Sequence, residues 1–202
     1  MLRAVATDGH RLAMAELPAP DGSADMPGII VPRKTVVELH KLIEDNDETV
    51  TLALSPTQIR ISFDSIVLTS KLIDGTFPEY GRVIPAGNDK IMTVDNARFT
   101  QAVDRVSTIS SERGRAVKLR VDDGRVTRTV NNPDSGSATE EMDAEFGGEG
   151  LEIGFNARYL LDITAQLEND QASFAMADPG SPILVRDPED DRALYVLMPM
   201  RV

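Results

Sequence analysis

The sequence predicts an α+β fold of repeated units, each with one helix followed by antiparallel strands, and with the helices on one face of the sheet. Three observations predict it. Three segments with an amphipathic helical pattern begin at Val31, Val94 and Phe155, an almost constant spacing. Each is followed by runs of alternating apolar and polar residues, as in half-buried strands. Turn-forming residues separate those runs.

Each helical segment has a start signal and one apolar stripe. Pro32 suits a first helical turn, while Asp95 and Asn156 are favourable N-cap residues. Apolar residues then recur with i, i+3, i+7 spacing, which is one face of a helix. They are Val36, Leu39 and Ile43, then Phe99, Ala102 and Val106, then Leu160, Ile163 and Leu167. The shared register indicates one repeated structural unit.

The expected strands follow the helices in chain order. They are TVTLALS, QIRISFD and SIVLTSKLID, then AVKLRVDDGRVTRTVNN and a strand near ATEEMDAEF, then ASFAMAD, PILVRD and ALYVLMPM. Asp123-Gly124 is a strong hairpin signal. The opening residues LRAVAT and HRLAMAELP read as two further strands without a preceding helix, and therefore as the end of a fourth unit.

Two units would form one domain. Residues 86–202 are then expected to form a complete domain, and residues 1–85 an incomplete one whose N-terminal part is missing. The stretch VIPAGNDK, residues 83–90, is the expected boundary, and PAPDGSADMPG, residues 18–28, is the expected loop inside the incomplete domain.

Composition excludes several classes of protein. The 202 residues are 41% hydrophobic and 27% charged, which is ordinary for a globular chain. No apolar run approaches the roughly 20 residues of a membrane helix. The N-terminus also lacks the layout of a signal peptide, so a cytoplasmic location is expected. Without cysteine, disulfides, cysteine-ligated metals and thiol nucleophiles are excluded.

The formal net charge of −12 argues against nucleic-acid binding, unless the charge is segregated. The helical segments have basic first turns, with Arg33 and Lys34 at the start of the first. If the helices share one face, that face is a mildly basic surface on an acidic protein. The alternative interpretation is that these are ordinary solvated helix faces.

Four stretches carry a more specific pattern: ATDGHRLA from Ala6, SKLIDGTFPEYGRVIP from Ser70, GFNARYLLD from Gly154 and the closing YVLMPMRV. Together they resemble the bacterial sliding clamp family, the beta subunit of DNA polymerase III, over essentially the whole chain. The resemblance implies the DNA-clamp fold and a homodimer ring that encircles duplex DNA during replication, with three domains per protomer. This chain is similar to the C-terminal portion of the protomer, so the first domain and the start of the middle domain are expected to be absent.

The resemblance also implies a processivity factor without catalytic activity, cofactor or metal. Such a factor tethers the DNA polymerase III alpha subunit, the clamp loader and other polymerases or repair proteins through short peptide motifs. The implied pocket maps onto Thr7, Gly9, His10, Arg11, Leu12, Pro78, Arg82, Val83, Asn156, Tyr159, Val196, Leu197, Met198, Pro199, Met200 and Arg201. Pro182 departs from the family pattern, in which a small hydroxyl residue is usual.

Two further contacts are implied by the resemblance. Arg33 and Lys34, in the first turn of a hole-lining helix, are expected to contact DNA phosphates. Ile109 is expected to lie at the junction between protomers.

The chemistry of the mapped residues fits a peptide cleft independently of the family. Leu12, Val83, Val196 and Met198 would supply apolar walls, and methionine adapts to several partner sequences. Arg82 could steer acidic peptides at the rim.

Two alternatives were weighed against this interpretation. Asp8 and His10 suggest a metal or acid–base site of a hydrolase, but a metal site needs three or four convergent ligands. No nucleophile elbow, P-loop or dinucleotide motif occurs in the sequence. A purely structural, adhesion-type β protein would leave three helices in a common register unexplained.

Overall fold

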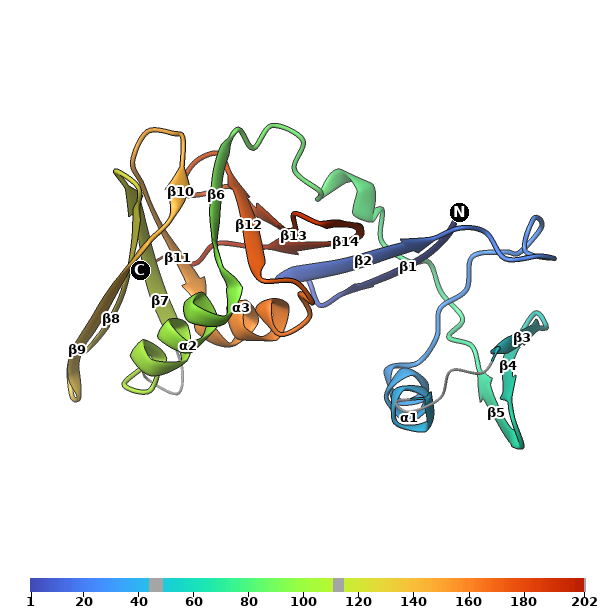
Figure 1. Ribbon diagram of the computed structural model, residues 1–202. Helices are drawn as coiled ribbons and strands as arrows, with labels where there is room; N and C mark the ends of the chain where they lie inside the picture. Colours follow the sequence, from blue (N-terminus) through green and yellow to red (C-terminus); the bar gives the residue numbers. More distant parts are fainter. Residues whose placement is uncertain (44–48, 111–114, 202) are drawn as a thin grey trace. The chain divides into compact units, whose positions relative to one another are not determined.

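The computed structural model describes residues 1–43, 49–110 and 115–201 (Figure 1). The chain forms two compact units. The larger one combines Met1–Pro20 with Tyr80–Val202, and the smaller one is Asp21–Glu79. Each unit has hydrophobic clusters of its own. No helix among the described residues has the length and apolar character needed to span a bilayer.

The larger unit contains two antiparallel sheets. The seven-stranded sheet has the order β1 (Leu2–Thr7), β2 (Arg11–Leu17), β14 (Asp190–Leu197), β13 (Ile183–Asp187), β12 (Gln171–Met176), β6 (Lys90–Asp95) and β10 (Glu145–Phe146). The four-stranded sheet has the order β11 (Leu151–Asn156), β7 (Ala116–Asp122), β8 (Arg125–Asn132) and β9 (Gly136–Asp143). The β1–β2 hairpin belongs to the larger unit, because β2 pairs with β14. The expected domain boundary near residue 85 stays a prediction.

Two helices, α2 (Asn96–Ser107) and α3 (Ala157–Thr164), lie side by side and contact both sheets (Figure 1). The predicted N-caps are confirmed. The Asp95 carboxylate accepts a hydrogen bond from the Arg98 backbone N–H. The Asn156 side chain accepts hydrogen bonds from the backbone N–H groups of Arg158 and Tyr159. The predicted stripes of both helices are buried, although Leu167 lies beyond the end of α3.

The two repeats of the larger unit exchange their first strands. Strand β6 leads into α2 but pairs with β12, which follows α3. Strand β11 leads into α3 but pairs with β7, which follows α2. This exchange merges both repeats into one core, in which the Phe99 and Phe174 rings lie 5.0 Å apart between centroids.

The smaller unit packs α1 (Arg33–Ile43) with a three-stranded sheet of β3 (Thr51–Leu54), β4 (Gln58–Phe63) and β5 (Ile66–Lys71). Leu39 and Ile43 of the predicted stripe pack against its core, but Val36 is 52% exposed. Thr35 is buried in its place, and its hydroxyl lies 2.6 Å from that of Ser70.

Candidate functional site

The seven-stranded sheet carries apolar side chains on both faces. Tyr195 and Leu197 of β14 pack into the main core, whereas Leu194 and Val196 belong to a separate cluster, as the alternation of a strand requires. Val196 lies directly opposite Leu12 of β2 and Leu184 of β13. The second cluster, here called the β2–β13–β14 cluster, consists of Leu12, Leu184, Leu194 and Val196, with Val5, Met14, Tyr80, Ile84 and Ala175 packed against it.

The segment that follows the smaller unit lies against this cluster. It forms a short 3₁₀ helix, η1 (Tyr80–Arg82), and the Val83 backbone N–H donates to the Tyr80 carbonyl at 3.0 Å. Tyr80 and Ile84 pack against the cluster, while Val83 between them is 47% exposed. Met198, which follows β14, is 40% exposed. Exposed apolar side chains that gather on a surface are typical of a binding site.

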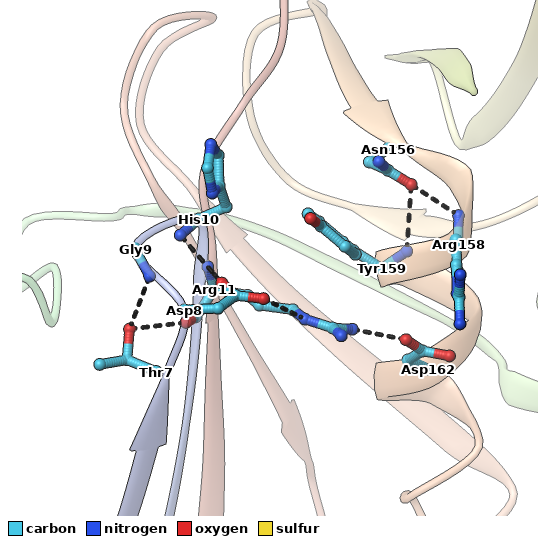
Figure 2. A network of polar contacts seen from close by, with 9 residues as sticks. All are labelled: Thr7, Asp8, Gly9, His10, Arg11, Asn156, Arg158, Tyr159 and Asp162. Carbon is cyan, nitrogen blue, oxygen red and sulfur yellow. Dashed lines mark hydrogen bonds and ion pairs between the residues drawn. The ribbon is translucent and has the colours of Figure 1, made fainter. Parts of the chain in front are cut away.

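The turn between β1 and β2 is held by its own side chains (Figure 2). The Thr7 hydroxyl donates to the Arg11 carbonyl at 2.8 Å and accepts from the Gly9 N–H at 3.2 Å. The Asp8 carboxylate accepts from the backbone N–H groups of His10 and Arg11, each at 3.0 Å. Gly9 has φ of +86°, a conformation that favours glycine. Asp8 is therefore occupied in shaping the turn.

Arg11 connects this turn to α3 (Figure 2). Its Nε donates to Asp8 Oδ2 at 3.1 Å and its Nη1 donates to Asp162 Oδ2 at 2.6 Å. The guanidinium carbon also lies 4.2 Å from the centre of the Tyr159 ring, a cation–π contact. Arg11 thereby links the β1–β2 turn to α3, two elements that lie far apart in the sequence.

The charges of this network reinforce one another. Burial alone would raise the pKa of Asp8, but the N–H groups of His10 and Arg11 and the Arg11 guanidinium outweigh it and lower the pKa. Burial would likewise lower the pKa of Arg11, but its hydrogen bonds to Asp162 and Asp8 raise it. Asp8 and Arg11 are thus ionised at neutral pH.

The C-terminal tail is tied down on both sides. The Met198 N–H donates to the His10 carbonyl at 2.9 Å, and the Met200 N–H donates to the Gly154 carbonyl at 2.8 Å. Pro199 and Met200 are half-buried and Arg201 is exposed. The tail therefore runs between the β1–β2 turn and β11.

Comparison with known proteins identifies the family. A family profile described as the DNA polymerase III beta subunit, C-terminal domain, matches residues 81–201, and the profile of the central domain matches residues 1–79. The chain belongs to the bacterial sliding clamp family.

Relatives agree along the whole chain. It is 58% identical to the beta sliding clamp of Caulobacter vibrioides over 201 residues, covering 100% of this chain and 54% of the relative. It is 41% identical to that of Pseudomonas aeruginosa, with coverage of 100% and 55%. The solved sliding clamp of Bartonella birtlesii bound to griselimycin has a TM-score of 0.96 at 55% identity, covering 99% of this chain and 54% of that one. The DNA-clamp fold is confirmed, and the chain spans about half the length of the curated relatives it matches.

Most of the residues predicted for the pocket belong to the larger unit. Thr7, Gly9, His10, Arg11 and Leu12 form the turn and the start of β2, and Asn156 caps α3 just before Tyr159. Arg82 and Val83 come from the segment at η1, and Val196 to Arg201 from β14 and the tail.

Other predicted positions of the clamp lie elsewhere. Leu197 is fully buried and faces the main core. Pro78 is an exposed residue of the smaller unit, as are Arg33 and Lys34 on α1. Ile109 is half-buried against the main core, and its carbonyl accepts a hydrogen bond from Asn132 Nδ2 at 2.7 Å.

Sequence reasoning missed several residues around the candidate site. Leu184 and Leu194 belong to the β2–β13–β14 cluster, and Asp162 Oδ2 accepts a hydrogen bond from Arg11 Nη1. The alternating pattern of β14 could have identified Leu194, because it shares a face with Val196. Nothing local indicates the pairing of Arg11 with Asp162. Pro182 is half-buried, and its carbonyl accepts from Asn88 Nδ2 at 2.9 Å.

Proposed function

We propose that this chain is part of a DNA sliding clamp, a non-catalytic processivity factor that acts in the bacterial cytoplasm. In this proposal a homodimer ring of full-length protomers encircles duplex DNA. It tethers the DNA polymerase III alpha subunit, the clamp loader and other polymerases or repair proteins. Residues 1–85 and 86–202 would belong to its middle and last domains, and Ile109 would lie at the ring junction.

One observation carries the tethering role: exposed Val83 lies between Tyr80 and Ile84, which pack against the β2–β13–β14 cluster, and exposed Met198 is hydrogen-bonded to His10 of the β1–β2 turn. A short apolar peptide segment could bury the exposed side chains of Val83 and Met198. The flexible Met198 side chain would adapt to different partners. Arg82 and Arg201 would attract acidic or carboxyl-bearing peptides from the rim.

The pocket chemistry sets the expected affinity. Short motifs held by a few apolar contacts and a charged rim bind with Kd values on the order of micromolar. Titration with a peptide from the C-terminal tail of a DNA polymerase III alpha subunit should therefore saturate in that range. Weak binding of this kind suits partners that exchange on one site.

DNA contact is proposed for the first turn of α1, where Arg33 and Lys34 are exposed. Reversing both charges, Arg33→Glu with Lys34→Glu, is expected to weaken binding of duplex DNA at low salt by about tenfold or more. Each lost phosphate contact lowers the slope of log K against log salt by about 0.9, so the slope should fall by about 2. Fluorescence anisotropy of a labelled duplex over a salt series measures both quantities.

A matched variant separates contact from net charge. Arg60→Glu with Lys71→Glu makes the same charge change on exposed residues of β4 and β5 in the same unit. It should leave the salt slope unchanged. Equal loss of DNA binding in both double variants would remove Arg33 and Lys34 from the DNA surface.

Catalysis is not part of the proposal. Asp8, which together with His10 suggested a hydrolase, accepts hydrogen bonds from two backbone N–H groups and from the Arg11 side chain. Within residues 1–43, 49–110 and 115–201, no group of three or more His, Cys, Asp or Glu side chains could hold a metal ion.

A further inference from the structure

Arg128 of β8 is a buried arginine without a hydrogen-bond partner. Its side chain is fully buried, and Nε, Nη1 and Nη2 have no acceptor in the described part of the chain. Its guanidinium carbon lies 5.7 Å from the centre of the Phe99 ring. Buried charges in folded proteins are normally paired, because desolvation of an unpaired charge is costly. An unpaired buried guanidinium therefore calls for an anion.

Arg128 borders a groove of about 540 Å³ between α2 and strands β8 and β9. Three other arginines line this groove: Arg98 and Arg105 from α2, and Arg125 from β8. Four arginines, two from α2 and two from β8, thus line one groove.

The carboxylates of the groove are committed to two of these arginines. Glu140 accepts from Arg105 Nε at 2.7 Å and from its Nη2 at 2.8 Å, a bidentate pair. Glu141 and Asp143 lie 3.9 and 4.0 Å from nitrogens of Arg125. Among the described residues, this leaves the Arg98 and Arg128 guanidiniums without a carboxylate partner.

The electrostatics around Arg128 agree with this arrangement. Burial lowers the pKa of Arg128, the charge of Glu140 opposes that shift, and Arg105 adds to it. The negative charge already present therefore does not compensate the buried cation. A further anion in the groove would compensate the charge of Arg128.

We propose that this groove binds a phosphate group, held by Arg98 and Arg128. Arginine presents a planar fork of donors that matches the oxygens of phosphate. A phosphate carries at least one negative charge at neutral pH and has several acceptor oxygens, so a single group can accept hydrogen bonds from both guanidiniums. The inference does not depend on the proposed function.

Thermal unfolding in inorganic phosphate, against sodium chloride of equal ionic strength, tests the site. Phosphate should raise the Tm of the wild-type chain, because a ligand of the folded state stabilises it. Arg98→Gln should weaken the apparent phosphate affinity by about tenfold, and Arg128→Met should remove the phosphate effect. Arg186→Gln is the control, since Arg186 is exposed on β13 and does not line the groove.

The variants remain informative if one of them affects folding. Arg98 is exposed, so Arg98→Gln should unfold at the wild-type Tm in chloride. Arg128→Met replaces an unpaired buried charge by an apolar side chain of similar length, and is expected to fold with equal or higher stability.

A short DNA duplex in a parallel titration distinguishes the source of the phosphate. Competition between the duplex and inorganic phosphate that depends on Arg98 and Arg128 supports the site, with the DNA backbone as one source. Stabilisation by phosphate alone also supports it, with a small free phosphate as ligand. Equal phosphate stabilisation of all four proteins, or none by either ligand, would overturn the proposal.

Discussion

Replacement of Met198 or Val83 by glutamate is expected to weaken binding of a DNA polymerase III tail peptide at least about 100-fold. Both side chains are substantially exposed, at 40% and 47%, so the folded chain tolerates the change. A bound peptide would press the new carboxylate against the apolar side chains of the β2–β13–β14 cluster and remove water from it. Burial of an unpaired charge costs several kcal/mol, which exceeds the roughly 3 kcal/mol of a 100-fold effect. Isothermal titration calorimetry measures the loss directly.

The matched control for this experiment is Val67→Glu. Val67 is 54% exposed on β5 of the smaller unit and is not among the residues assigned to the pocket. Its variant should bind the peptide as the wild type does. If Met198→Glu and Val83→Glu also bind with wild-type affinity, the assigned pocket is wrong.

Truncation of Leu197 to alanine is expected to lower the free energy of unfolding by about 2–5 kcal/mol. Leu197 is fully buried in the main core, so the change leaves a cavity among well-packed neighbours. The adjacent Met198 is 40% exposed, and Met198→Ala should alter stability by no more than about 0.5 kcal/mol. Urea denaturation of both variants measures these free energies.

The same two variants distinguish a residue that contributes to peptide binding, Met198, from one that contributes to stability, Leu197. Met198→Ala should weaken peptide binding although it barely affects stability. Leu197→Ala should retain peptide affinity under conditions in which the chain is folded. The reverse outcome, a stable Leu197→Ala with impaired binding, would mean that β14 turns its other face to the pocket.

Local patterns in the sequence predicted local structure well. The caps at Asp95 and Asn156 form as expected, because an N-cap depends on neighbouring residues only. The hairpin at Asp123-Gly124 also forms, with φ values of +48° and +76° that suit these two residues.

Non-local features were beyond sequence reasoning. The exchange of β6 and β11 between the repeats depends on hydrogen bonds between strands distant in the chain, and one-dimensional periodicity carries no information on partners. The exposure of Val36 shows the same limit within a helix. Its stripe was placed by spacing, but Thr35 occupies the buried position next to Ser70.

The candidate site combines both kinds of information. The resemblance to sliding clamps supplied the turn, the tail and Tyr159, but it grouped Leu197 with Val196 although the two face opposite sides of the sheet. Two further residues of the cluster, Leu184 and Leu194, were identified only by the strand register.

Methyl NMR with the same tail peptide tests the central claim most directly, namely that partners bind the β2–β13–β14 cluster. The methyl signals of Leu12, Leu184 and Val196 should shift in proportion to the bound fraction. Those of Met92 and Met176, which are fully buried in the main core, should change little. Saturable peptide binding that leaves the cluster methyls unmoved and shifts signals elsewhere would contradict the account.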